Sequence, residues 1–321
     1  MSGRSLPFWL VATTSYLGQR PGLGGPLPVT WQRKWLDLAA RTLPEPRGTI
    51  ARKITLGGRP ALRITVGATE RTTAIVHLHG GAYTVGSPRS HRALAAYLAQ
   101  ASGAVVYLPD YRLAPEHPYP AALEDAVAGC LEVAEKHARF AISGDSAGGG
   151  LAVAAARRLV DAGHDSPAAL GLISPWVDPA AEPTGRKRDM VVREKWGRRS
   201  AAHYLGVGDP AESGFAPGRG DLSSLPPTLV QINRREVLYP QVSEFGGSLR
   251  RAGVDVTLTE LPRLWHVGHV MAGVLVDAQQ AVDELGSFLQ THLRAPVAEP
   301  VRPKPGATSP RVATLAASGQ K

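Results

Sequence analysis

The 321-residue sequence has very little cysteine and no long apolar run. Its single cysteine, Cys130, excludes an internal disulfide framework and any metal site built only from cysteines. Cys130 lies within an apolar helical pattern, so we expect its side chain to be buried. One cysteine is compatible with a reducing compartment, and we expect a cytoplasmic protein.

The chain also lacks a segment with the features of a membrane span. Its apolar opening segment, Leu6 to Leu17, is too short to cross a bilayer and contains Pro7. Only Arg4 supplies a positive charge before it, and no small-residue cleavage site follows, so we do not expect a signal peptide. We expect a lid helix here, or one that touches a membrane surface.

Acidic residues are fewer than basic ones, 27 against 36, which leaves a formal net charge of +9. The basic residues are scattered along the chain, and no nucleic-acid-binding motif is present. Because nucleic-acid binding needs a concentrated basic stripe, we expect no nucleic-acid partner. Loose contact with an anionic membrane surface remains open.

Short β-type runs alternate with helical patterns over most of the chain, after a hairpin at 49–66. The expected strands cover residues 74–79, 104–108, 140–143, 170–174, 228–232 and 254–260. The expected helices cover residues 31–41, 90–101, 121–137, 151–160, 241–251 and 270–293. This alternation predicts an α/β fold, with a mostly parallel central sheet and helices on both of its faces.

Changes in composition suggest how the chain is divided. Residues 1–45 hold N-terminal helices and a linker, and residues 46–177 hold the first part of the α/β core. Residues 178–225 are polar, basic and rich in proline and glycine, with three short candidate helices, so we expect an insertion over the sheet edge. The core resumes at 226–294. Residues 295–321 lack periodicity, which predicts a disordered tail.

The pattern Gly-Asp-Ser-Ala-Gly at residues 144–148 separates a buried strand from an Ala-rich helix. It matches the G-x-S-x-G nucleophile elbow, in which a sharp strand-to-helix turn exposes the serine hydroxyl. The two glycines leave room for the close approach of strand and helix. Ser146 is therefore the candidate nucleophile, with the backbone N–H of Ala147 directed at the same place.

Glycines also follow the strand at 74–79, where His79 precedes Gly80 and Gly81. A loop without Cβ atoms lets backbone N–H groups approach a ligand, as an oxyanion hole requires. His77 and His79 alternate along this strand, but no third ligand is in view. We therefore expect no metal.

In the α/β architecture with this elbow, the acid and then the histidine follow the serine in the chain. Glu236 is the one carboxylate between the strand at 228–232 and the next helix, and His266 follows the last strand. Glu236 and His266 are thus the candidate acid and base. His269 is the second candidate base, and Glu244 is a weaker rival acid because it lies inside a helix pattern.

Three motifs together resemble the hormone-sensitive-lipase-like esterases, the bacterial GDXG family. They are HGGAY at 79–83, DYRLAPEHPYPA at 110–121 and GDSAGG at 144–149. The segments at 225–228 and 236–238 also resemble the family, so the likeness covers roughly residues 28 to 294. It implies an α/β-hydrolase fold with a helical cap that combines the N-terminal helices and the 178–225 insertion.

The resemblance also implies an activity. We expect a serine carboxylesterase for short-to-medium acyl esters, without a cofactor, with Gly80, Gly81 and Ala147 as oxyanion donors. Three residues in or beside the motifs are expected to contact the small-molecule ester: Tyr83, Asp145 and Trp265. A monomer and a homodimer are both compatible with the sequence.

Two features depart from the family pattern. Arg235 precedes Glu236 where further acids are common, and Trp265 replaces the small residue usual before the catalytic histidine. Two alternative functions therefore stay open. The same site suits an amidase or arylformamidase, and a catalytically weak ligand-binding pseudoenzyme would also retain the fold.

Overall fold

The computed structural model describes residues 7–19, 23, 27–68, 71–182 and 189–295. Within them, one sheet contains eight strands in the order β1-β2-β4-β3-β5-β6-β7-β8. β1 and β2 form an antiparallel hairpin, β2 is antiparallel to β4, and every other neighbouring pair is parallel. The strands are β1 Thr49–Leu56, β2 Arg59–Val66, β3 Thr73–Leu78, β4 Val105–Pro109, β5 Arg139–Asp145, β6 Leu170–Ile173, β7 Thr228–Ile232 and β8 Val256–Glu260.

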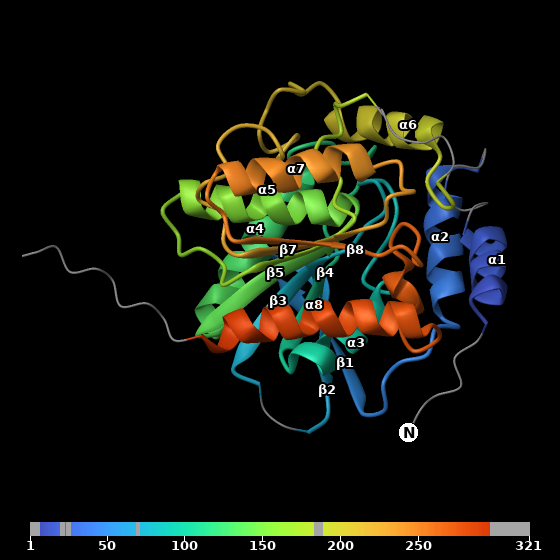
Figure 1. Cartoon of the computed structure of the whole chain (residues 1–321). Helices are drawn as coiled ribbons and strands as arrows, with labels where there is room; N and C mark the ends of the chain where they lie inside the picture. Colours follow the sequence, from blue (N-terminus) through green and yellow to red (C-terminus); the bar gives the residue numbers. More distant parts are fainter. Residues whose placement is uncertain (1–6, 20–22, 24–26, 69–70, 183–188, 296–321) are drawn as a thin grey trace, which may run out of the picture.

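Helices cover both faces of this sheet (Figure 1). α3 (Arg92–Ser102) and α8 (Val276–Arg294) pack together on one face. α4 (Ala121–Lys136), α5 (Ala147–Asp161) and α7 (Tyr239–Arg251) lie on the other. The central strands are buried on both sides, as parallel strands between two helical layers must be. The predicted α/β fold with a mostly parallel sheet is confirmed.

Two helix predictions differ from the structure. The helix predicted at 270–293 is divided into a 3₁₀ turn, η1 (Gly268–Met271), and α8, which begins at Val276. Gly273 lies between them at φ +79°, a left-handed conformation that ends a right-handed helix. In the 178–225 insertion, the described residues contain one α-helix, α6 (Glu194–Leu205), where three were expected. Glycines and prolines after Leu205 prevent further helical turns.

The N-terminal helices α1 (Phe8–Gln19) and α2 (Val29–Ala40) lie side by side at one end of the molecule, with α6 near α2 (Figure 1). Trp35 Nε1 donates a hydrogen bond to the Gly18 carbonyl at 2.6 Å, and so joins α2 to α1. Trp196 Nε1 donates to Gln32 Oε1 at 3.2 Å, and so joins α6 to α2. These contacts bring the two predicted cap segments together. Most of the predicted tail, from residue 296, lies outside the described residues.

No helix in the described ranges combines the length and the apolar character that a membrane crossing requires. The apolar opening segment is instead the short helix α1, which contacts α2.

Candidate active site

Ser146 occupies a strained turn between β5, which ends at Asp145, and α5, which begins at Ala147. Its φ of 51° and ψ of −120° are unfavourable for a residue with a side chain. The turn requires glycine on both sides. A Cβ on Gly144 would lie 2.2 Å from the Gly148 carbonyl oxygen, and a Cβ on Gly148 would lie 2.0 Å from that of Leu78. This close packing holds the Ser146 hydroxyl at the carboxyl end of the sheet.

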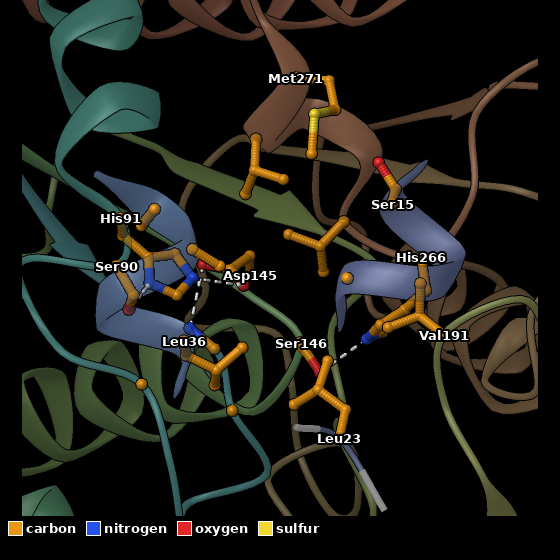
Figure 2. Close-up of a pocket in the computed structure, with 18 of the residues that line it drawn as sticks. Ser15, Leu23, Leu36, Ser90, His91, Asp145, Ser146, Val191, His266 and Met271 are labelled. Atoms are coloured by element: carbon orange, nitrogen blue, oxygen red, sulfur yellow. Dashed lines mark hydrogen bonds and ion pairs between the residues drawn. The ribbon is translucent and has the colours of Figure 1, made fainter. Parts of the chain in front are cut away.

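Three side chains from separate loops form a continuous hydrogen-bonded relay. Ser146 Oγ lies 2.9 Å from His266 Nε2, and His266 Nδ1 lies 2.7 Å from Glu236 Oε2. Glu236 follows β7 and His266 follows β8, so both come from the carboxyl edge of the sheet. Figure 2 shows His266 directed at Ser146. The structure thus brings together the nucleophile, base and acid predicted from the sequence.

The second oxygen of Glu236 is held by two donors that the sequence analysis missed. Glu236 Oε1 accepts hydrogen bonds from Ser174 Oγ and from the Asn233 backbone N–H, each at 2.9 Å. The Asn233 side-chain amide donates to the carbonyl oxygens of Leu261 and Leu264, at 2.6 and 2.5 Å. Asn233 therefore ties the loop of the acid to the loop of the histidine. Both donor residues directly follow a strand: Ser174 follows β6 and Asn233 follows β7. This position at the carboxyl edge of the sheet is the sequence feature that could have identified them.

Burial alone lowers the pKa of His266, but the hydrogen bond and the negative charge of Glu236 outweigh it, so the pKa is raised above its usual value. The neighbouring arginines do not draw Glu236 away. Arg234 pairs with Glu260, and Arg235 is exposed whereas Glu236 is buried. Glu236 can therefore stabilise an imidazolium at His266 and fix its tautomer.

The two rival residues make other contacts. His269 Nε2 lies 2.9 Å from Gln231 Oε1, and burial lowers the pKa of His269 to about 3. Glu244 is exposed on α7 and pairs with Arg251. Neither one is in the relay, so the geometry favours His266 and Glu236.

The loop after β3 differs in one respect from the prediction. The Gly80 N–H donates to Asp145 Oδ1 at 3.0 Å, so it is already engaged and cannot serve an oxyanion. Within the described part of the chain, no hydrogen bond is made by the N–H groups of Gly81, Ala82 and Ala147. Gly81 and Ala82 have positive φ angles of 122° and 52°, and both line the cavity that contains Ser146. Ala82 therefore replaces Gly80 among the candidate donors.

Asp145 anchors this loop from beneath. Besides the Gly80 N–H, it lies 3.3 Å from the Nε2 atoms of both His77 and His91. Burial raises the pKa of Asp145, but the charges and hydrogen bonds of His91 and His77 outweigh this and hold it far below its usual range. Asp145 was expected to contact the substrate; it lines the cavity, but its carboxylate is engaged within the protein. His91 lies in no motif, so no sequence pattern predicts its place beside Asp145.

Two cavities meet at Ser146 and His266. The larger has a volume of about 460 Å³ and a mostly apolar lining (Figure 2). Its walls come from α1, α2 and η1, and include Ser15, Leu36 and Met271. The smaller, of about 50 Å³, is lined in part by Trp176 and Gln241, and Trp196 borders both cavities. Ser146 and His266 are therefore accessible from both cavities.

Neither Tyr83 nor Trp265 is among the described residues that line these cavities. The Tyr83 ring is fully buried and stacks on Tyr204, with ring centroids 3.6 Å apart. Trp265 packs edge-on against Phe8 at 5.9 Å. Both side chains support the walls from behind, so the structure does not place them in contact with a substrate. The described residues also contain no cluster of His, Cys, Asp and Glu able to hold a metal.

Comparison with known proteins agrees with this geometry. Residues 75–270 match the profile of a family with the alpha/beta hydrolase fold. The chain is 40% identical to an acetyl-hydrolase of Streptomyces hygroscopicus over 74% of this chain and 84% of the relative. It is 32% identical to an esterase of Acinetobacter venetianus over 80% of this chain and 87% of the relative.

Solved structures give the same picture. An esterase from the bacterial hormone-sensitive lipase family superposes with a TM-score of 0.83 and 32% identity, covering 91% of this chain and 100% of that chain. A hormone-sensitive lipase from a metagenome library has a TM-score of 0.83 and 28% identity, covering 90% of this chain and 99% of that chain. The elbow, the loop after β3 and these similarities identify one family: the chain belongs to the hormone-sensitive-lipase-like carboxylesterases, serine hydrolases of the α/β-hydrolase fold.

Proposed function

We propose that this protein hydrolyses short-to-medium acyl esters through Ser146, His266 and Glu236. The relay of 2.9 and 2.7 Å contacts at the junction of two cavities is the observation that carries the proposal. Ser146 Oγ attacks the ester carbonyl while His266 Nε2 takes its proton. Glu236 holds the imidazole in the productive tautomer and stabilises its positive charge.

Collapse of the tetrahedral intermediate breaks the ester bond, and His266 returns the proton to the leaving alcohol. Water then attacks the acyl-enzyme in the same way and releases the acid. The free N–H groups of Gly81, Ala82 and Ala147 stabilise the oxyanion in both steps. Losing one such donor typically costs about 10²–10³ in rate.

The acyl group occupies the larger cavity, whose walls are mostly apolar. In this proposal α1, α2 and α6 form the cap, and residues 46–177 and 226–294 form the core beneath it. The inner sides of α1 and α2 limit the chain length, since their side chains line this cavity. Relatives named acetyl-hydrolase and esterase are consistent with small acyl groups.

The test is steady-state hydrolysis of p-nitrophenyl esters of graded chain length by the native protein and Ser146→Ala. We expect Ser146→Ala to lose activity by a factor on the order of 10⁴ or more, with its thermal unfolding unchanged. Ser166→Ala is a matched control, because Ser166 lies in the loop between α5 and β6. Hydrolysis retained by Ser146→Ala would remove the assignment. Assaying an ester and its matching amide in parallel tests the amidase alternative. Cleavage of the ester alone would exclude an amidase.

A further inference from the structure

Helix α1 carries no charged side chain and yet exposes large apolar residues at the surface. Its twelve residues, FWLVATTSYLGQ, include no charged side chain. Trp9 is 68% exposed and Leu17 is 64% exposed. Large apolar side chains that gather on an exposed surface are typical of a site that contacts another surface.

Helix α2 extends the same apolar surface. Trp31, Trp35 and Leu38 are all exposed, and their spacing of four and three residues places them on one side of the helix. The Trp35–Gly18 hydrogen bond joins this side to α1. We call these five side chains the aromatic face: Trp9, Leu17, Trp31, Trp35 and Leu38. Its residues come from α1 and α2, which lie together at one end of the molecule (Figure 1).

Cations border the aromatic rings of the two helices. Lys34 Nζ lies 5.5 Å from the centroid of the Trp31 ring, and the Arg263 guanidinium lies 5.9 Å from that of Phe8. Arg263 also pairs with Asp277 at 3.4 Å, but its side chain stays 68% exposed. Asp37, the acidic residue of α2, hydrogen-bonds Ser87 instead of extending towards solvent. Exposed tryptophans beside lysine and arginine, in a chain of net charge +9, are complementary to a lipid surface with anionic headgroups.

The opposite sides of the same helices line the larger cavity. α1 contributes Val11 and Ser15, and α2 contributes Leu36 and Ala39. One layer of helix therefore separates the aromatic face from the cavity that contains Ser146. Any surface that binds the aromatic face therefore lies directly against the wall of the larger cavity.

We propose that the aromatic face docks on an anionic lipid surface. The tryptophan and leucine side chains insert among the upper acyl carbons, while Lys34 and Arg263 contact the headgroups. Docking does not depend on catalysis. The further step, in which esters dissolved in that surface enter the cavity, rests on the proposed esterase function.

The test is flotation of the full chain carrying Ser146→Ala with vesicles of phosphatidylcholine, alone or with phosphatidylglycerol. The inactive protein leaves the lipid intact, so binding is measured apart from the esterase function. We expect at least about tenfold tighter binding to the anionic vesicles, weakening as salt is raised. Trp9→Ser combined with Trp31→Ser should lower the affinity at least about tenfold. Ile50→Ser, which changes an exposed apolar residue on β1, should have no effect.

Three results would overturn docking on lipid. The first is that the protein binds neither kind of vesicle. The second is that the double tryptophan variant and its parent bind vesicles equally well. The third is that the parent binds no vesicles but forms a dimer in sedimentation, and the double variant does not form it. The last would assign the aromatic face to a second copy of the chain. In the active background, the double variant should hydrolyse dissolved p-nitrophenyl acetate at the parent rate, which shows that its fold is intact.

Discussion

Removing the negative charge of Asp145 tests whether the buried anchor beneath the loop after β3 positions the oxyanion donors. Asp145 accepts the Gly80 N–H at 3.0 Å and contacts His77 and His91 at 3.3 Å each. The loop and the carboxylate are in direct contact, since a Cβ on Gly80 would lie 2.1 Å from Asp145 Oδ2. Gly81 and Ala82, which carry the free N–H groups, directly follow this anchor in the chain.

The expected cost follows from these contacts. Asp145→Asn keeps the shape but replaces an anionic acceptor with a neutral one, so we expect to lose about 1.5–3 kcal/mol of unfolding free energy. Complete loss of an oxyanion donor costs about 10²–10³ in rate. Because Asn still offers one carbonyl oxygen to Gly80, we expect kcat to fall about tenfold, and KM to change little.

The assay is kcat and KM for p-nitrophenyl acetate, together with urea unfolding, for the native protein and Asp145→Asn. Glu132→Gln is a matched control, because Glu132 Oε2 accepts the Gly57 N–H at 2.6 Å on the β1–β2 hairpin. The control should lose stability and keep its kcat. A native kcat in Asp145→Asn would refute the reasoning, and so would a loss confined to KM.

Two further predictions concern pH. His266 must be neutral to accept the Ser146 proton, and its pKa is raised, so kcat/KM should rise with pH through a midpoint above about 6.5. Glu236→Gln should move this midpoint to lower pH and lower the plateau by a factor on the order of 10²–10⁴; an unmoved midpoint in the pH–rate profile would contradict the contact. His269 is buried with a pKa of about 3, so the unfolded chain binds a proton there below about pH 6.5 that the native protein does not. Unfolding free energy should therefore fall as the pH is lowered from 6.5, by up to about 1.4 kcal/mol per unit from this group. His269→Gln should make that fall shallower in urea titrations at several pH values, and an unchanged slope would be evidence against burial as the cause.

Local patterns in the sequence were sufficient for the architecture and for the three residues of the relay. Strand and helix periodicities are local properties of the chain, and parallel strands bring their carboxyl ends to one edge. Residues placed just after β5, β7 and β8, such as Ser146 and His266, therefore had to meet there. The helix at 270–293 was less predictable, because its apolar pattern continues through Gly273, whose φ of +79° breaks it.

The direction of individual groups depended on the tertiary structure. Sequence alone placed Gly80 among the oxyanion donors and Tyr83 at the substrate, and it gave no reason to single out His91. The pairing of β3 with β5 sets Leu78 opposite Gly144, and the chain just beyond it brings the Gly80 N–H onto Asp145, leaving Gly81 and Ala82 free. Tyr83 stacks on Tyr204 of α6, more than a hundred residues away. Neighbours that are distant in sequence determine the direction of a backbone N–H group or an aromatic ring. A local sequence pattern contains no information about those neighbours.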